Sequence, residues 1–175
     1  MPQRGLCGYF AIRSGRRAVK KNETASVTVT DMNSLGSGVG HIENKAVFIA
    51  GAVTGDQAVV KIIKDGGSYY VGRLEELTEP SPLRTGCDCA AFPRCGGCAF
   101  RHIGYEYEKE LKKRFVEGFL RKEGLADLQV LPLLSTGRRE GYRNKVQYPY
   151  RDGKLGYYAA HSHRVVENGG CMLHQ

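Results

Sequence analysis

Four short apolar runs decide the fold of the first half of this chain. They read Ser26-Val-Thr-Val-Thr30, Ala46-Val-Phe-Ile-Ala50, Ala58-Val-Val-Lys-Ile-Ile63 and Tyr69-Tyr-Val-Gly-Arg-Leu74. The first run alternates with a period of two, and the others are rich in β-branched or aromatic residues, as is typical of strands. Gly-rich turns separate them, and no helical period intervenes. Such a series of short strands favours a small closed β-barrel.

The composition of the 175 residues is that of a folded protein, with 41% hydrophobic and 25% charged residues. No apolar run reaches the length of about 18 residues that a membrane span needs, and the first residues lack the apolar core of a secretory signal. We therefore expect a cytoplasmic protein without a membrane partner. Its oligomeric state does not follow from the sequence.

Charge divides the chain into three parts. Residues 1–22 carry six Lys or Arg and no acid, residues 23–80 carry an acidic excess of four, and residues 81–175 carry a basic excess of six, for a net charge of +8. A Glu-Pro-Ser-Pro sequence at residues 79–82 marks a stiff linker. We expect a flexible basic tail, an acidic barrel and a basic second domain, with these boundaries. The basic balance suggests a polyanion as partner.

Four of the six cysteines fall within twelve positions, at Cys87, Cys89, Cys95 and Cys98. Without a secretory signal, a disulfide framework is the poorer interpretation. Thiolates are soft metal ligands, and the Gly-Gly pair inside Cys95-x2-Cys98 permits the tight turn that lets two sulfurs face one centre. The spacing favours an inorganic centre over buried reduced thiols, but it leaves zinc and an iron–sulfur cluster open.

The second half mixes one helix with short strands. Tyr107, Leu111, Phe115 and Phe119 recur every four residues and predict a helix over roughly residues 105–122. Its basic face is either solvated or in contact with RNA. Strands are predicted at 129–134, 145–150, 156–160 and 164–167, with a hairpin turn at 151–154. The fold class is therefore mainly β with α: an OB-like barrel followed by an α+β domain.

Basic and aromatic residues interleave between Arg138 and Arg164. Seven Lys or Arg and five Tyr stand in this stretch against two acids. Cations that hold phosphates and rings that stack on unpaired bases are a common means of binding single-stranded RNA. A sheet with a tyrosine core face and a basic solvent face explains the pattern equally well. Composition alone does not choose between the two.

In their order along the chain, these motifs resemble the N-terminal half of the SAM-dependent RNA (uracil-5-)-methyltransferases of the 23S rRNA type. The glycine-rich barrel segment at residues 36–56 is similar to that family's TRAM domain. The specific features are Cys89-x5-Cys95-Gly-Gly-Cys98, then Gly141-Tyr-Arg-Asn-Lys145, then Ser162-His-Arg-Val-Val166, and finally Cys171. The resemblance covers about residues 24–175.

The resemblance implies a 4Fe–4S cluster and an RNA partner, with rRNA expected. Carried over by position, the cluster ligands are Cys89, Cys95, Cys98 and Cys171, while Cys87 departs from the pattern and could replace Cys89. The RNA contacts are Arg143 and Lys145, followed by His163 and Arg164.

The family's catalytic domain, with its SAM loop and nucleophilic cysteine, is not matched here. We therefore assign no catalytic residue and expect this chain alone neither to bind SAM nor to methylate RNA.

Two alternatives remain open. One is a standalone, non-enzymatic RNA-binding protein with a zinc site made of four cysteines. The other is a fragment of a radical-SAM RNA-modifying enzyme, since such enzymes can also carry TRAM barrels. That class has a Cys-x3-Cys-x2-Cys triplet, whereas this chain has x5 in the first interval, so the radical-SAM alternative ranks last.

Overall fold

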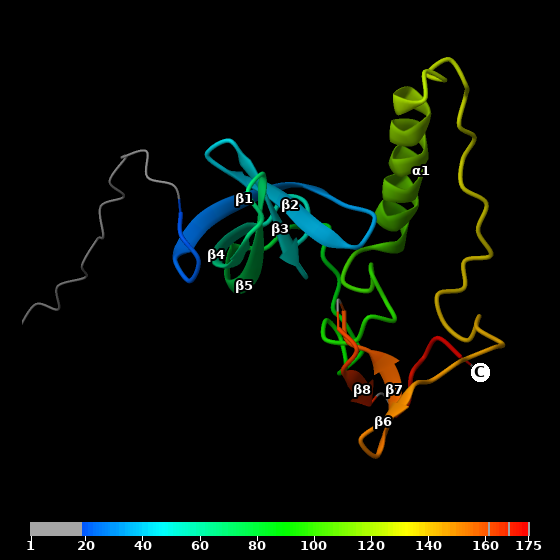
Figure 1. The fold of residues 1–175 in the computed structure, drawn as a ribbon. Helices are drawn as coiled ribbons and strands as arrows, with labels where there is room; N and C mark the ends of the chain where they lie inside the picture. The colour runs from blue at the N-terminus through cyan, green and yellow to red at the C-terminus, as the bar shows by residue number, and fades with distance from the viewer. Residues whose placement is uncertain (1–18, 161, 168, 175) are drawn as a thin grey trace, which may run out of the picture.

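Five strands close into a barrel in the first half of the computed structural model, which describes residues 19–160, 162–167 and 169–174 (Figure 1). The barrel order is β1-β2-β3-β5-β4, and every pair is antiparallel except the parallel pair β3–β5. The mainly β fold with an OB-like barrel is thereby confirmed. The strands are β1 Thr24–Met32, β2 Ser37–Ile42, β3 Lys45–Ala50, β4 Gln57–Asp65 and β5 Tyr69–Glu79.

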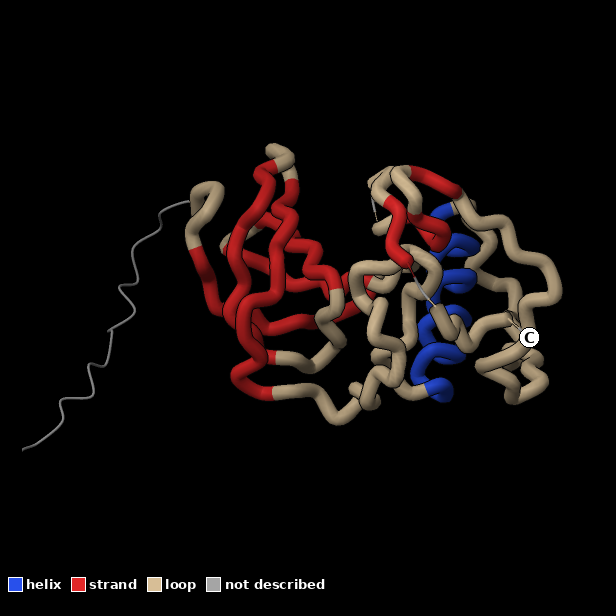
Figure 2. Tube along the Cα trace, turned by 90° about the horizontal axis from the view of Figure 1, so that it is seen from below, coloured by secondary structure: helices blue, strands red, loops and turns tan. Residues whose placement is uncertain are grey.

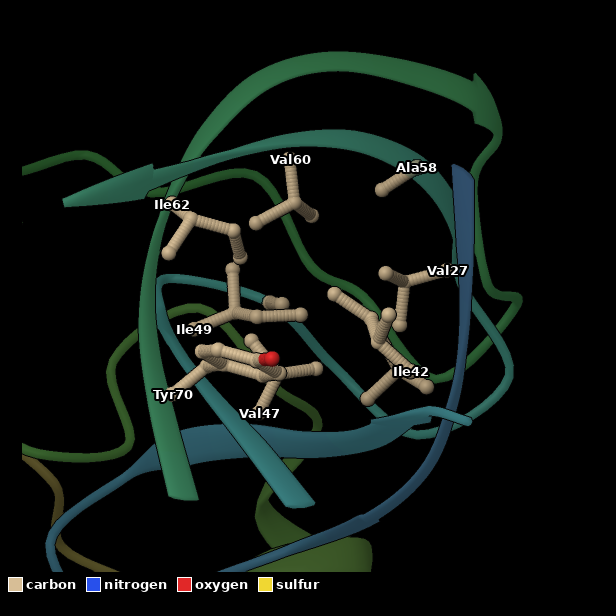
Figure 3. Close-up of a cluster of buried hydrophobic side chains, with 10 residues drawn as sticks. Val27, Ile42, Val47, Ile49, Ala58, Val60, Ile62 and Tyr70 are labelled. Atoms are coloured by element: carbon tan, nitrogen blue, oxygen red, sulfur yellow. The ribbon is translucent and has the colours of Figure 1, made fainter. Parts of the chain in front are cut away.

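The period-two pattern sends one face of each strand into the barrel. Val27, Val47, Ile49, Val60 and Tyr70 are among the buried side chains that fill it (Figure 3). The glycines of β2 belong to this packing, because a Cβ at position 40 would lie 2.3 Å from Val27 Cγ1. The glycine-rich run of β2 therefore lets strands approach closely.

The helix α1, Tyr105–Lys122, stands beside the barrel, and its bounds match the prediction. Leu111 is its fully buried residue, and it packs with Ile103 against Met32 and Val53 of the barrel half. This second apolar cluster joins the two halves of the molecule. Figure 2 shows that loops make up most of the chain around the helix. No helix among the described residues is both long and apolar enough to cross a membrane.

A small sheet of three strands completes the second half, in the order β6-β7-β8. The strands are β6 Tyr150–Arg151, β7 Lys154–Tyr158 and β8 Val165–Glu167. Arg151 pairs with Lys154, and both intervening residues, Asp152 and Gly153, have positive φ, at 53° and 74°. This is the geometry of a two-residue hairpin turn, so the predicted turn is confirmed.

The strand predicted at residues 129–134 is wrong, and the one at 145–150 is reduced to its last residue. Residues 125–136 form no regular element but return along the length of α1 (Figure 1). Pro132 lacks a backbone donor, and Leu131 and Leu134 are exposed rather than covered by a second layer. An apolar run without a neighbouring strand does not form a sheet.

The predicted domain boundaries stay predictions. Residues 1–18 of the expected tail, including Cys7, lie outside the described residues. Val19 is described, and it packs against the barrel core.

Candidate metal centre and nucleic-acid interface

The cysteine loop, residues 87–98, is fastened to the end of β7. Cys95 forms an antiparallel bridge with Ala159, and the Gly96 N–H donates a hydrogen bond of 2.8 Å to the Tyr158 carbonyl. Within the loop, the Cys95 N–H donates to the Ala91 carbonyl at 2.9 Å and closes a turn. The loop thus has no regular secondary structure of its own but takes its position from the small sheet.

Cys171 reaches the same region on a separate segment. Residues 141–143 hold that segment through backbone hydrogen bonds, from the Gly141 N–H to the Met172 carbonyl at 2.8 Å and from the Arg143 N–H to the Leu173 carbonyl at 2.9 Å. The Arg101 guanidinium adds a contact of 3.5 Å to the Met172 sulfur. Two stretches that are distant in sequence are therefore held against each other.

The four cysteines expected as ligands, Cys89, Cys95, Cys98 and Cys171, line one cavity. Its free volume is about 20 Å³, enough for about one water molecule, so the four thiols, and not free space, are what suits the site to a metal centre. Phe92, Tyr157 and Leu173 supply apolar walls. No three His, Cys, Asp or Glu side chains of the described residues form a group that could hold a single metal ion.

Cys87 lies apart from this arrangement. It is exposed, it does not line the cavity, and its sulfur contacts the Cys89 carbonyl at 3.9 Å. Cys95 in contrast is buried, and Cys89, Cys98 and Cys171 are partly buried. The structure thus separates the two candidates for the first ligand position, although the ligand roles themselves stay a prediction.

The charges around the cavity suit a thiolate cluster. Burial raises the pKa of the Cys95 and Cys98 thiols, and the neighbouring cysteines raise both further. The Gly97 N–H, 3.4 Å from the Cys95 sulfur, and the Arg143 guanidinium act in the opposite direction on Cys95, as Arg101 does on Cys98. A metal centre that replaces the thiol protons would have two guanidiniums and an N–H close by to offset its negative charge. The residues present fit such a group.

Arg101 is a fixed part of this site. Its guanidinium is held by two carboxylates, Asp88 at 2.9 Å and Glu140 at 2.7 Å. Burial alone would lower the Arg101 pKa, but these hydrogen bonds raise it, so the charge is permanent. Arg101 thereby links the cysteine loop to the segment that precedes residues 141–143.

Comparison with known proteins identifies the barrel. The family model described as the TRAM domain matches residues 18–74. Residues 18–74 are a TRAM domain.

The chain is also homologous to proteins named as RNA methyltransferases. An uncharacterized RNA methyltransferase of Clostridium tetani is 35% identical over 159 residues, and one of Nostoc sp. is 36% identical over 159 residues. The matches cover 89% and 87% of this chain but 35% of each relative. The chain therefore spans about a third of the length of the relatives that it matches.

A solved structure supports the fold beyond the TRAM domain. The crystal structure of the Pyrococcus abyssi tRNA (uracil-54, C5)-methyltransferase in complex with S-adenosyl-L-homocysteine superposes with a TM-score of 0.59 at 21% identity. The match covers 85% of this chain and 32% of the Pyrococcus chain. It therefore includes most of the part that carries the cysteine loop.

Arg143, the first expected RNA contact, lies against the cysteine loop. Its guanidinium donates to the Gly97 carbonyl at 3.3 Å and to the Tyr157 hydroxyl at 3.1 Å, and it also lies over the Tyr157 ring. Burial alone would lower its pKa, but the hydrogen bond to Tyr157 and nearby tyrosines raise it. Both terminal nitrogens of the Arg143 guanidinium thus donate to protein groups.

The other three expected RNA contacts have exposed side chains. Lys145 lies in the extended segment before β6, while His163 and Arg164 lie in the turn between β7 and β8. His163 and Arg164 line a second pocket. The structure therefore brings two of the four predicted residues together and places Arg143 beside the cysteines instead.

Sequence reasoning assigned no site role to two pairs of residues. Arg84 and Asp56 form an ion pair between the cysteine-bearing half and the TRAM domain. Arg101 and Tyr157 line the cysteine cavity. Arg101 follows Cys98 by three positions, and this closeness was the signal available for it. Arg84 and Asp56 carry no local signal, because their pairing spans 28 positions.

Proposed function

We propose that this chain is the RNA-binding, 4Fe–4S-carrying part of an RNA (uracil-5-)-methyltransferase of the 23S rRNA type, acting in the cytoplasm. The observation that carries the proposal is that Cys89, Cys95 and Cys98 line one cavity with Cys171, which comes from a distant segment. Four thiols that line one site suit an iron–sulfur cluster. The TRAM domain and the relatives named as RNA methyltransferases support the RNA partner.

The cluster would have a structural task. When bound, it supplies bonds from iron to four sulfurs, which crosslink the cysteine loop to the segment around Cys171. Arg101 and Arg143 hold the same two segments from either side through their own hydrogen bonds. The protein groups therefore arrange the thiols, and the cluster would lock that arrangement.

RNA would bind on the basic side of this second domain. Lys145, His163 and Arg164 are exposed and available for phosphate contacts. Arg143 would act on the same surface mainly by holding Gly97 and Tyr157 in place. The acidic excess of residues 23–80 restricts the RNA contacts of the barrel to a local face.

Methyl transfer is assigned to parts of the relatives that this chain does not match. The chain covers about a third of those relatives, and none of its residues is proposed as catalytic or as a ligand of SAM. The Pyrococcus enzyme, which was crystallised with S-adenosyl-L-homocysteine, is likewise matched over only 32% of its length. We expect no methylation by this chain alone.

The decisive experiment is metal analysis after anaerobic purification. We expect about four iron and matching sulfide per chain, with a brown absorbance band. Cys171→Ser and Cys89→Ser should lose the iron, whereas the matched control Cys87→Ser should retain it. Stoichiometric zinc without iron in the wild-type protein contradicts the cluster and favours the alternative of a four-cysteine zinc site. Iron retained by Cys89→Ser and lost by Cys87→Ser reverses the assignment of the first ligand.

The choice of RNA has a separate test. Fragments of 23S rRNA and a tRNA transcript should compete for the chain at fixed salt, with the rRNA fragment binding more tightly. Tighter binding of the tRNA contradicts the rRNA assignment and leaves the cluster proposal intact.

A further inference from the structure

A basic pocket lies at the small sheet and includes His163 and Arg164, two of the expected RNA contacts. The β6–β7 hairpin contributes Arg151, Asp152 and Lys154, and the turn between β7 and β8 contributes Ser162, His163 and Arg164. The pocket is open and has a volume of about 530 Å³. We propose that it binds successive phosphates of a single-stranded RNA backbone. The inference rests on the proposed function and deepens it, because it names the phosphate site and the contacts that hold this site in place.

Strand pairing places the cations on one face. Arg151 is directly opposite Lys154, and Tyr158 is directly opposite Val165, which also lines the pocket. Side chains alternate along a strand, so Lys154 and Tyr158 share a face of β7. The same face of the sheet therefore carries two cations at one end and an aromatic ring at the other.

The charge of the pocket favours an anion. Three cations, Arg151, Lys154 and Arg164, stand against one carboxylate, Asp152. The Arg151 Nε lies 3.8 Å from the Asp152 Oδ2, but both side chains are highly exposed, so the attraction between them is weak. The carboxylate belongs to the hairpin turn, where residue 152 has positive φ. A net positive charge thus remains for phosphates.

An aromatic surface adjoins the cations. The rings of Tyr158 and His163 pack edge to face with centroids 5.4 Å apart, and Tyr158 is still 45% exposed. Phosphates held by cations beside an exposed ring are the arrangement by which proteins bind single strands, since each base has a face that can stack. This favours a nucleic-acid strand over an acidic peptide, which has no base to stack.

Backbone hydrogen bonds attach Ser162 and Arg164 to Ala159, the residue after β7. The Ala159 N–H donates to the Arg164 carbonyl at 2.8 Å, and the Ser162 hydroxyl accepts the Arg164 N–H at 3.1 Å. Ala159 is also the residue that bridges to Cys95. One wall of the pocket is thus continuous with the cysteine loop, so ordering of the cysteines also orders the phosphate site.

The test measures binding of fluorescein-labelled oligouridylate to the complete, anaerobically purified chain over a range of salt concentrations. The double variant Lys154→Ala/Arg164→Ala should bind several-fold more weakly. Its plot of log affinity against log salt should be shallower by about 1.4, since each lost single-strand phosphate contact removes about 0.7. The matched control Arg121→Ala/Lys122→Ala removes the same charge from the last turn of α1. It should leave the slope unchanged.

A second pair of variants tests the ring. Tyr158→Leu should lower the affinity without changing the salt slope, and Tyr158→Phe should bind like the wild-type protein, because stacking needs the ring and not the hydroxyl.

Three outcomes overturn the inference. If the wild type binds oligouridylate and the Lys154/Arg164 variant keeps its slope, the pocket is not the phosphate site, and the proposed function stands. If both double variants flatten the slope equally, or poly-glutamate displaces the RNA as well as unlabelled oligouridylate does, the pocket is a general anion patch. If the wild type binds no RNA, the proposed function fails together with the pocket.

Discussion

Arg84 and Asp56 form a bidentate ion pair between the cysteine-bearing half and the TRAM domain. The Arg84 Nη2 lies 2.6 Å from the Asp56 Oδ2, and its Nε lies 2.8 Å from the Oδ1. The same guanidinium donates to the Gly51 carbonyl at 2.8 Å. Asp56 is fully buried and Arg84 is 20% exposed in its side chain. The pair therefore fixes the angle between the two halves.

The first prediction concerns the loss of this pair. Burial alone would raise the pKa of Asp56, but hydrogen bonds from Arg84 and from the N–H groups of Ser81 and Val53 outweigh it and lower the pKa. Asp56→Asn leaves the Arg84 charge without its partner and should lower the free energy of unfolding by about 3–5 kcal/mol. Urea denaturation followed by circular dichroism measures the change.

The control for that prediction is an exposed pair. Asp65 lies 3.3 Å from the Lys45 Nζ, with both side chains more than 30% exposed. Asp65→Asn should lower the free energy of unfolding far less than Asp56→Asn does, because water screens an exposed pair. Equal costs for the two substitutions would show that the Asp56 pair contributes no more than a surface contact.

The second prediction concerns acid. His102 is buried against Phe92, and burial lowers its pKa below 6.5, with Arg84 acting in the same direction and the Ala52 backbone and Asp56 opposing in part. As the pH falls through about 6.5, His102 takes up a proton in the unfolded chain but stays neutral in the folded chain. Stability should therefore be complete above that pH and fall below it, by at most about 1.4 kcal/mol per pH unit.

The His102 effect has a direct check. The fall in urea midpoint between pH 7 and pH 5 should be smaller in His102→Leu than in the wild-type protein. Asp56, with its lowered pKa, adds a further loss only at more acid pH, near and below its ordinary value of 3.8. An NMR titration that finds the His102 ring protonated at pH 7 would contradict the prediction even if the variant does not fold.

The barrel and helix could be predicted because their signals are local. The alternation in residues 26–30 reports burial on one face of β1. The four-residue spacing predicted α1, where Leu111 is buried and Tyr107 and Phe115 are partly buried, while Phe119 at the end of the series is exposed. The strand predicted at 129–134 failed for the opposite reason. Its apolar residues have the pattern of a strand, but a strand forms only beside a partner strand. A short segment of sequence does not show whether the chain will lie beside another strand.

Part of the candidate site could likewise be predicted from the sequence, and part could not. The spacing within residues 87–98 indicated a shared centre, and the family resemblance added Cys171. Cys89, Cys95, Cys98 and Cys171 line one cavity, while their role as ligands stays a prediction. The role of Arg143 could not be read, because an arginine in a basic, tyrosine-rich stretch has the same sequence signal whether it faces RNA or a carbonyl. The position of Gly97, 46 residues earlier in the chain, decides which group the Arg143 guanidinium contacts. Contacts between distant segments are set by packing, and single sequences do not reveal them.

The third prediction uses two glycines with the same backbone conformation. Gly36 has φ of 80°, and a Cβ there would lie 2.0 Å from the Ala99 carbonyl oxygen, beside the cysteine loop. Gly67 has φ of 82° and nothing within 4 Å of such a Cβ. Gly67→Ala should cost only the left-handed backbone penalty of about 1–2 kcal/mol. Gly36→Ala should cost about 1–3 kcal/mol more, because two backbones must move apart.

Urea denaturation of both glycine variants separates the two effects. The difference between them reports the contact between the TRAM domain and the chain next to Cys98. If the two alanine variants are equally stable, the close approach of residues 36 and 99 does not exist in solution.

The fourth prediction separates holding the cysteines from contacting RNA. Arg143 donates to the Gly97 carbonyl and the Tyr157 hydroxyl, whereas Lys145, two positions later, is exposed. Arg143→Ala frees the loop between Cys95 and Cys98 and removes a positive charge beside the thiols. Loss of such a supporting contact typically weakens metal binding by about 10–100-fold. Iron in the anaerobically purified variant should therefore be lost at chelator concentrations that leave the wild-type protein intact.

Lys145→Ala is the matched control, because it removes the same charge from the same segment. It should retain iron like the wild-type protein and show a weaker, less salt-dependent affinity for oligouridylate, since an exposed lysine contributes through phosphates alone. Arg143→Lys distinguishes charge from geometry: a lysine keeps the charge but lacks the planar fork that reaches both Gly97 and Tyr157, so iron should still be lost. If Arg143→Ala keeps its iron and loses RNA affinity with a shallower salt slope, Arg143 is an RNA contact after all. The bonds to Gly97 and Tyr157 must then open when RNA binds.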